Sequence, residues 1–224
     1  MDAAKYCPVC QSPVTEFVPK RATSTPGVKC PVCKSNARTR FAWIFFERHT
    51  DLLDGSPKSL LHFAPEPSLR TRLAQVPGLD YLTADIDPAK AMVRVDITDI
   101  QFDDDHFDGV YCSHVLEHVA KDRRAIGEIL RVLKPGGWAV FVVPIKADQT
   151  FEDPSITDPA ERERRFGQHD HVRLYGPDFL DRLREAGFLA RAMRPADVLE
   201  PGEEATFGIP SSSSRVIFFA TKPT

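Results

Sequence analysis

The chain of 224 residues is 42% hydrophobic and 27% charged, with a formal net charge of −3. This balance excludes a disordered chain, and no apolar run approaches the roughly 18 to 20 residues of a membrane helix. The N-terminal sequence MDAAKYCPVC lacks the basic and apolar regions of a secretory signal. We therefore expect a cytoplasmic protein without membrane contact, with one domain of ordinary size and a smaller module.

Charge is distributed unevenly along the chain. Residues 1–48 carry eight Lys/Arg against three Asp/Glu, a balance of +5, whereas the remainder has a balance of −8. A basic N-terminal segment on an acidic body predicts either an anionic partner for that segment or a solvated basic surface. Both interpretations stay open at this point.

Cysteine spacing identifies a metal site near the N-terminus. Two CPVC knuckles, Cys7 with Cys10 and Cys30 with Cys33, offer four thiolates to one tetrahedral ion. The alternatives are two disulfides, which a reducing cytoplasm disfavours, or four unrelated thiols. Because four cysteines leave no open position, we predict a structural Zn²⁺ in a module over residues 1–35 that is similar to a zinc ribbon.

A connecting helix is predicted next. Phe41, Ile44, Phe45 and Leu52 recur at helical spacing, so we expect a helix over about 36–53, within a connecting segment 36–56, with its aromatic residues in the core. Three basic residues of this helix are expected either to face solvent or to meet a phosphate: Arg38, Arg40 and Arg48.

From residue 57 to 224 the chain alternates short apolar runs with amphipathic segments, a pattern typical of an α/β sheet. Strands are predicted at 59–63, 81–86, 92–95, 107–112, 138–143, 188–193 and 216–220. Helices are predicted at 68–75, 122–133 and 177–186, with Pro135, Gly136 and Gly137 ending the second. Residues 144–175 form a long polar stretch whose charged part, 161–165, predicts a solvated helical turn, and 211–214 predict a loop.

Two signatures in this region carry a family resemblance. FDGV at 107–110 is followed by HVLEH at 114–118, and LRVLKPGG occupies 130–137. In this order and spacing they resemble the class I S-adenosylmethionine-dependent methyltransferases, in particular the methyltransferase domain 11 group, over about 58–188. The resemblance implies a seven-stranded Rossmann-like α/β sheet, S-adenosylmethionine as cofactor and methyl transfer.

The resemblance also implies cofactor-binding residues. Ligands of an open parallel sheet lie beyond the carboxyl ends of its strands. An acid after the second strand binds the ribose hydroxyls, and an acid followed by an aliphatic residue after the third binds adenine. The positions that match, together with those after the fourth strand, are Asp85 (with Asp87 as a competitor), Asp96, Ile97, Ser113 and His114.

The first motif of the family is altered. His62 stands where the family has an acid, and Phe63, Ala64, Pro65 and Glu66 replace a glycine-rich loop. We interpret these five residues as a variant cofactor loop in which Glu66 replaces the missing carboxylate. A pocket that no longer binds, or one that binds another nucleotide-like ligand, are the alternatives.

A polar cluster after the fifth strand is the candidate for chemistry. His169, His171, Arg173 and Tyr175 could supply a base and an anchor for an anionic acceptor. The alternative is a hydrogen-bonded cluster that orders the loop. Metal binding by the two histidines lacks a third ligand in the neighbouring sequence. Glu117 and His118 are expected to brace their helix.

The sequence thus predicts methyl transfer to an acceptor that it does not identify, with a small molecule or a glycan favoured. The Asn/Asp-Pro-Pro-Tyr signature of exocyclic amine methylation is absent, since Val143, Pro144 and Ile145 occupy its place. One alternative is an RNA methyltransferase that uses the basic zinc module for recognition. Another is a non-catalytic zinc-ribbon adaptor with a degenerate methyltransferase fold.

Overall fold

The computed structural model describes residues 5–19, 29–210 and 215–224. The chain forms two compact units, each built from three separate segments. The first unit takes the described residues of 1–57, 66–79 and 194–215, and the second those of 58–65, 80–193 and 216–224. No helix in the described part of the chain is long and apolar enough to cross a bilayer. The loop predicted at 211–214 lies outside the described residues.

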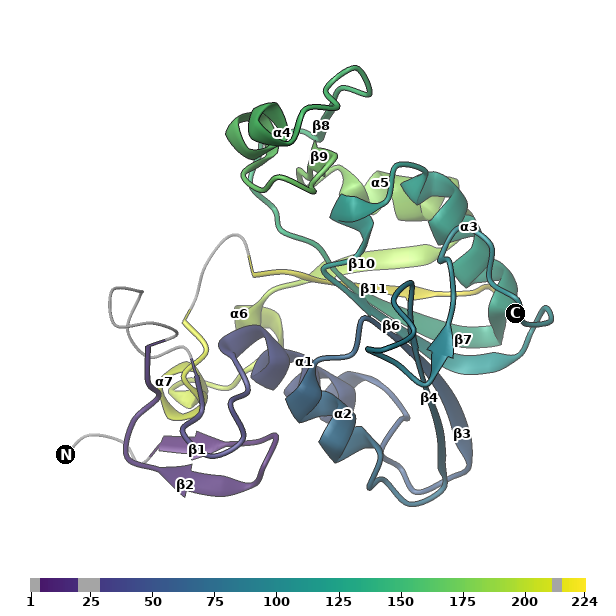
Figure 1. Cartoon of the computed structure of the whole chain (residues 1–224). Helices are drawn as coiled ribbons and strands as arrows, with labels where there is room; N and C mark the ends of the chain where they lie inside the picture. Colours follow the sequence, from purple (N-terminus) through teal and green to yellow (C-terminus); the bar gives the residue numbers. More distant parts are fainter. Residues whose placement is uncertain (1–4, 20–28, 211–214) are drawn as a thin grey trace. The chain divides into compact units, whose positions relative to one another are not determined.

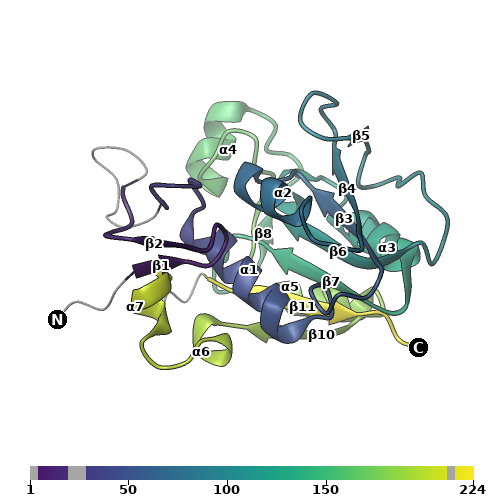
Figure 2. The same ribbon diagram turned by 90° about the horizontal axis from the view of Figure 1, so that it is seen from below.

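The first unit combines a small hairpin with helices. Its described elements are β1 (Lys5–Cys7), β2 (Ser12–Val14), α1 (Ala37–His49), α2 (Pro67–Leu73), α6 (Pro195–Val198) and α7 (Glu203–Phe207). The helix α7 lies beside β1 in Figures 1 and 2, where Lys5 Nζ donates to the carbonyl of Ala205 at 3.1 Å. The sequence predicted neither α6 nor α7, because segments this short carry little periodicity.

The helix α1 confirms the predicted connecting helix, although it is shorter. Its N-terminus is capped by Asn36, whose side chain accepts from Thr39 N at 3.1 Å. It ends at His49 rather than near residue 53, because Thr50 has extended backbone angles and its Oγ1 donates to the carbonyl of Phe46 at 2.8 Å. The predicted burial of the aromatic side chains is confirmed.

Arg40 corrects the prediction for the basic residues of this helix. It is fully buried, neither solvated nor available to a phosphate. Its guanidinium donates to the carbonyls of Phe207 at 2.6 Å, Ser35 at 2.8 Å and Gly208 at 2.7 Å. It also stacks 3.8 Å above the ring of Phe17. These bonds compensate for burying the charge.

The second unit confirms the predicted seven-stranded α/β sheet (Figure 1). Its strands are β3 (Lys58–Phe63), β4 (Leu79–Asp85), β5 (Val93–Arg94), β6 (Phe107–Ser113), β7 (Leu133–Val142), β10 (Leu189–Met193) and β11 (Ile217–Thr221). They lie in the order β10-β11-β7-β6-β3-β4-β5. The strands β3 to β7 run parallel where register is defined, and β11 is antiparallel to both β7 and β10.

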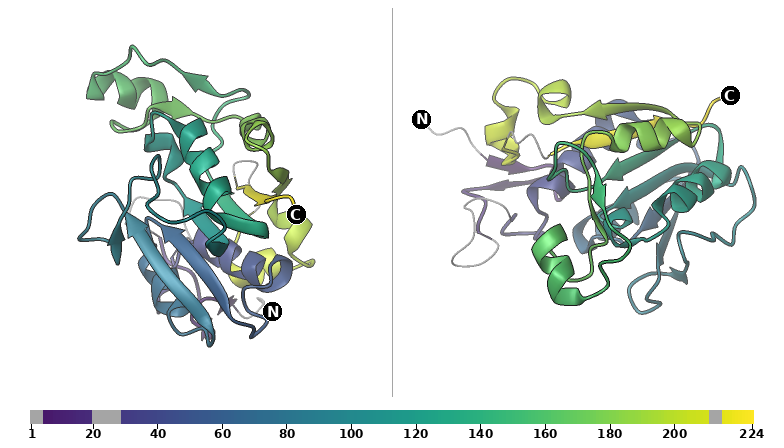
Figure 3. Two further views of the ribbon diagram at one scale, coloured as in Figure 1. Left: turned by 90° about the vertical axis from the view of Figure 1, so that its right-hand side faces the viewer. Right: turned by 90° about the horizontal axis from the view of Figure 1, so that it is seen from above.

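Helices and a short hairpin complete this unit. They are η1 (Leu116–His118), α3 (Asp122–Val132), β8 (Phe151–Glu152), α4 (Pro159–Phe166), β9 (Arg173–Leu174) and α5 (Phe179–Glu185). Ile126 and Ile129 of α3 are fully buried in the core, as their spacing predicts. The helix α4 stands away from the sheet in both views of Figure 3 and contains the predicted solvated turn at 161–165.

The boundary between α3 and β7 differs from the prediction. The helix ends at Val132, and Pro135, Gly136 and Gly137 lie inside β7 instead of terminating the helix. Leu133 already has extended angles and pairs with Phe107, after which the register shifts. Gly136 has a positive φ of 76°, so this segment forms an irregularity within the strand.

Candidate cofactor pocket and four-cysteine site

A pocket of about 690 Å³ lies in the second unit, where β3, β4, β5 and β6 end. This volume falls within the usual range for small-molecule sites. Six of the residues predicted to bind a cofactor line it: Phe63, Ala64, Asp85, Asp96, Ile97 and His114. They come from four separate strand ends, which the parallel sheet brings to one edge.

Asp85 is the last residue of β4 and faces the pocket. Its Oδ1 accepts from the backbone N of Asp87 at 2.9 Å, which fixes the carboxylate at the start of the following turn. Asp87 is half-buried and does not line the pocket, and its Oδ2 lies 3.4 Å from Lys90 Nζ. Of the two neighbouring acids, only Asp85 is therefore available to a ligand in this pocket.

Asp96 and Ile97 follow β5 and supply a polar and an apolar part of the wall. Asp96 Oδ1 accepts from both N and Oγ1 of Thr98 at 2.8 Å. These bonds lower the pKa of Asp96, so the carboxylate is ionised near neutral pH. Ile97 is nearly fully buried and lines the pocket.

The altered loop after β3 contributes Phe63 and Ala64 to the pocket. Ala64 has a positive φ of 47°, a conformation that favours glycine, and its N donates to the carbonyl of Ala84 at 2.9 Å. The backbone therefore follows a glycine-type path although the glycines are missing. Pro65 does not line the pocket, and the carboxylate of Glu66 lies 3.9 Å from Arg38 Nε within the first unit.

His62 is not brought to the pocket. Successive side chains of a strand point to opposite faces, so His62 and Phe63 cannot share one. The imidazole is fully buried, with Nδ1 2.7 Å from the Tyr81 hydroxyl and its ring 4.8 Å from that of Tyr111. Ser113 is likewise buried and does not line the pocket.

The segment after β6 holds His114, predicted to bind the cofactor, and Glu117 and His118, expected to brace their helix. His114 has a positive φ of 54°, and its Nδ1 lies 2.9 Å from Glu117 Oε1. His118, one turn further, lines the pocket together with Asp170, whose Oδ2 lies 3.2 Å from His118 Nδ1. His114 lies outside the short 3-10 helix, so no helical spacing in the sequence signalled that His118 would share its pocket.

The structure separates the four residues predicted to carry the chemistry. The two histidines lie next to residues of the pocket wall, whereas Arg173 and Tyr175 do not. His169 is exposed, and the neighbouring Asp170 lines the pocket. His171 is 5% exposed, with its ring 4.7 Å from that of His118. Arg173 and Tyr175 are both buried away from the pocket.

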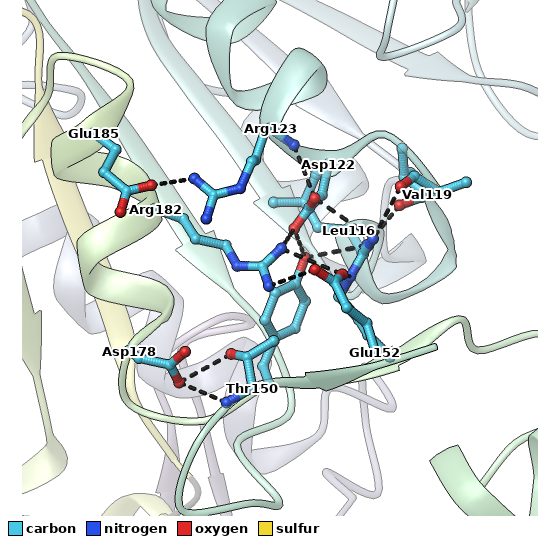
Figure 4. Close-up of polar contacts among 12 residues, drawn as sticks. Leu116, Val119, Asp122, Arg123, Thr150, Glu152, Asp178, Arg182 and Glu185 are labelled. Atoms are coloured by element: carbon cyan, nitrogen blue, oxygen red, sulfur yellow. Dashed lines mark hydrogen bonds and ion pairs between the residues drawn. The ribbon is translucent and has the colours of Figure 1, made fainter. Parts of the chain in front are cut away.

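Arg173 and Tyr175 belong to a buried polar network, part of which Figure 4 shows. Tyr175 donates its hydroxyl to Asp122 Oδ2 at 2.7 Å, and Arg182 donates to the same oxygen at 2.7 Å. Arg173 donates to Glu152 Oε2 at 2.8 Å and to the carbonyl of Leu116 at 2.8 Å. Burial raises the pKa of Tyr175 well above its ordinary value.

This network explains what Arg173 and Tyr175 do in the fold. Arg173 donates to the carbonyls of Leu116 and Ala120, in the segment that follows the pocket-lining His114. It also binds Glu152 of β8, so the hairpin β8–β9 is tied to the edge of the pocket. The hydrogen bonds of both side chains are used within the protein, which favours the loop-ordering interpretation.

In the first unit the four cysteines of the CPVC knuckles converge. Their Sγ atoms lie within 4.8 Å of one another, with Cys7 to Cys33 at 3.7 Å and Cys10 to Cys30 at 3.8 Å. A disulfide requires about 2.05 Å, so these pairs are not disulfides. Four sulfurs at about 2.3 Å from one Zn²⁺ lie roughly 3.8 Å apart, which matches the observed spacing.

The electrostatics of this cluster also suit a cation. A hydrogen bond from the Cys7 thiol lowers the pKa of Cys33 to about 4, so the cluster holds negative charge at neutral pH. Burial lowers the pKa of the Arg40 guanidinium to about 10, while the charges of the nearby cysteines oppose this shift. A four-thiolate zinc centre carries a net charge of −2, which the buried Arg40 partly balances.

Comparison with known proteins agrees with these features. Residues 64–141 match the family model described as "Methyltransferase domain". A 49-residue segment is 51% identical to the demethylmenaquinone methyltransferase of Clavibacter sepedonicus, covering 22% of this chain and 20% of that protein. The chain thus matches about a fifth of this relative's length.

Two solved structures share the fold. The [4+2]-cyclase SpnF has a TM-score of 0.59 at 17% identity, over 94% of this chain and 88% of that one. The phosphoethanolamine N-methyltransferase 2 of Haemonchus contortus, in complex with S-adenosyl-L-methionine, has a TM-score of 0.52 at 15% identity, over 82% of this chain and 56% of that one. At these identities the likeness establishes the fold alone.

Proposed function

Since residues 64–141 of this chain form a class I S-adenosylmethionine-dependent methyltransferase domain, we propose that the protein transfers a methyl group from S-adenosylmethionine to an acceptor. The observation that carries this proposal is the pair of carboxylates, Asp85 and Asp96, at two neighbouring strand ends of one pocket. The cofactor supplies a methyl group activated by its sulfonium. The protein supplies binding, orientation and, for an acceptor that bears a proton, a base.

The donor set of the pocket fits the cofactor. Asp85 can accept hydrogen bonds from both ribose hydroxyls, because only its Oδ1 is engaged by a backbone N–H. Asp96, held by Thr98, can accept from the exocyclic amine, and Ile97 gives the adenine ring an apolar surface. The glycine-type φ of Ala64 supports a variant cofactor loop over a decayed one.

Calorimetric titration with S-adenosylmethionine and S-adenosylhomocysteine tests the proposal. We expect micromolar binding, about −8 kcal/mol. Asp85→Ala should weaken binding by about tenfold or more, since a hydrogen bond to a charged group contributes ~1.5–3 kcal/mol. Asp87→Ala is the matched control and should leave the affinity nearly unchanged. No binding heat from a folded protein would instead support the adaptor alternative.

His169 remains the proposed base. Its exposure beside the pocket-lining Asp170 leaves the imidazole free to approach an acceptor. His169→Ala should lower turnover and spare cofactor affinity. Equal loss of both would mean that the side chain only orders its loop. Because a [4+2]-cyclase shares this fold, cofactor binding without methyl transfer to any acceptor would point to another reaction.

For the acceptor we favour a small molecule or a glycan. The chain outside residues 1–48 has a charge balance of −8, which repels a polyanion. The alternative is RNA held by the basic N-terminal segment. A salt-dependent mobility shift on RNA would support that alternative, because phosphate contacts release counterions.

For the four cysteines we propose a structural Zn²⁺. The sulfur spacing, the low pKa of Cys33 and the nearby Arg40 support it. Its role would be to hold the hairpin β1–β2 to the start of α1 within the first unit. Elemental analysis should find one zinc per chain.

A further inference from the structure

A second cluster of ligand-type side chains lies beside the cofactor pocket. Glu117, His118 and His171 each offer one oxygen or nitrogen atom, and these atoms lie within 4.8 Å of one another. Glu117 and His118 belong to η1, and His171 comes from the loop after α4. Glu117 is 1% exposed and His171 is 5% exposed, so the cluster is built into the protein and is no surface coincidence.

Two buried atoms in this cluster have no hydrogen-bond partner among the residues that the structure describes. They are Oε2 of Glu117 and Nδ1 of His171. Native proteins rarely leave such atoms unsatisfied, so each one calls for an explanation. Each belongs to a side chain that offers a ligand atom within 4.8 Å of those of the other two. Ligands held at about 2.1 Å by one ion lie roughly 3–4 Å apart, which small side-chain rotations in this cluster would reach.

In Glu117 and His118 the second polar atom of the side chain is already engaged by a neighbouring residue, as in the outer shell of a metal site. Nδ1 of His118 lies 3.2 Å from Asp170 Oδ2, which leaves Nε2 for a ligand. Glu117 Oε1 lies 2.9 Å from Nδ1 of His114, which leaves Oε2 for a ligand. Metal-binding histidines typically donate their second ring N–H to a carboxylate or a backbone carbonyl.

We propose that Glu117, His118 and His171 bind a divalent transition-metal ion. Two imidazoles and one carboxylate suit Zn²⁺, Mn²⁺ or Fe²⁺ better than Mg²⁺ or Ca²⁺, which prefer oxygen ligands alone. Three protein ligands leave coordination positions open, the arrangement of catalytic and not structural metal sites. This site differs from the four-cysteine cluster in its ligand atoms, in the negative charge that the ligands carry and in having coordination positions left open.

The position of the site suggests its use. His118 lines the cofactor pocket as well as belonging to the cluster. A divalent ion there would meet an oxygen donor of the methyl acceptor and lower the pKa of its hydroxyl group. This second step rests on the proposed function, whereas metal binding itself does not. This role of the ion restricts the methyl acceptor to a molecule with a hydroxyl group. Either the hydroxyl oxygen itself is methylated, or the methylated atom lies next to that hydroxyl group.

The test uses the full chain loaded with one Zn²⁺ per chain for the four cysteines, so that the second cluster stays open to the probe ion. Mn²⁺ is titrated and followed by the electron paramagnetic resonance signal of the free ion, and Co²⁺ is followed by visible absorption. We expect one ion per chain. Glu117→Gln and His171→Gln should each weaken binding by about 10- to 100-fold or more, whereas His169→Gln, an exposed neighbour, should retain it.

Further controls distinguish loss of metal binding from loss of folding. His118→Gln changes a side chain that is 32% exposed, so it provides a variant that should fold even where Glu117→Gln does not. Far-ultraviolet circular dichroism verifies each variant. Absence of binding by both ions, or binding that the folded variants retain, would overturn the metal site. Because the titration contains neither cofactor nor acceptor, a failure of the proposed methyl transfer leaves its result unaffected.

Discussion

The Nδ1 atom of His62 lies 2.7 Å from the hydroxyl oxygen of Tyr81, and both side chains are buried in the second unit. His62 occupies the position at which the family has an acid, yet the imidazole binds a neighbouring strand instead of facing the pocket. The altered position thus contributes to the sheet, and the candidate cofactor pocket is formed without it.

Tyr81→Phe should therefore lower stability and not cofactor affinity. Loss of a buried hydrogen bond costs about 1 kcal/mol, or up to ~3 kcal/mol if the histidine stays unsatisfied. Urea unfolding measures the first quantity and calorimetric titration with S-adenosylhomocysteine the second. A tenfold loss of affinity at unchanged stability would show that His62 acts on the cofactor after all.

Two glycines make a matched pair of substitutions. A Cβ on Gly109 would lie 2.7 Å from Trp138 Cζ2, whereas one on Gly127 of α3 would meet nothing within 4 Å. We expect Gly109→Ala to destabilise by about 1–3 kcal/mol through overpacking. Gly127→Ala should stabilise by ~0.5–1 kcal/mol, because alanine favours the helix interior. Thermal unfolding of both variants checks the opposite signs, and destabilisation by both would contradict the close contact with Trp138.

Stability should fall in acid through Glu152. Burial raises the pKa of Glu152, but hydrogen bonds from Arg182 and Arg173 lower it more, so its pKa is lower in the folded protein than in the unfolded one. Its contribution is thus present above the unfolded value of about 4.3 and is lost as the pH falls through the folded pKa. Urea unfolding between pH 7 and pH 3 should show a shallower loss for Glu152→Gln.

The control for this profile is Glu163→Gln, which changes an exposed residue of α4. It should follow the unsubstituted protein at every pH. A Glu152→Gln variant with an unchanged acid profile would mean that Arg173 and Arg182 do not depend on this carboxylate.

Removal of zinc should unfold part of the first unit. Cys10→Ser leaves three thiolates, so we expect loss of the bound zinc and a lower unfolding temperature, since metal binding contributes to folding free energy. Cys112→Ala is the control, because Cys112 is buried in β6 of the second unit and should leave one zinc per chain. Elemental analysis decides between them. Because the cluster of Glu117, His118 and His171 could also hold zinc, Cys10→Ser is made together with Glu117→Gln, and one zinc per chain retained in that double variant would rule out the four-cysteine site.

The sequence predicted features that depend on local spacing. The two knuckles with Cys7, Cys10, Cys30 and Cys33 predicted the convergence of four sulfurs, and alternating apolar runs predicted all seven strands of the sheet. Both follow from short-range geometry, a two-residue turn or a period of two. The family signatures then located the carboxylates at the strand ends.

Contacts between distant segments could not be predicted. The sequence around His171 contains no third metal ligand, because Glu117 and His118 come from a segment more than 50 positions earlier. The burial of Arg40 was missed for the same reason, since its acceptors on Phe207 and Gly208 follow some 167 positions later. A periodic pattern reports which face is buried, not which segment covers it.

The bonds of Arg40 bear on the order in which this protein is completed during synthesis. A chain is made from its N-terminus, and a segment can fold only after it has left the ribosome. The four cysteines and Arg40 are made before Phe207 and Gly208, so Arg40 at first has only the carbonyl of Ser35 among these three acceptors. The first unit is therefore assembled from segments made at different times, and until Phe207 and Gly208 are made the Arg40 guanidinium lacks two of its carbonyl acceptors.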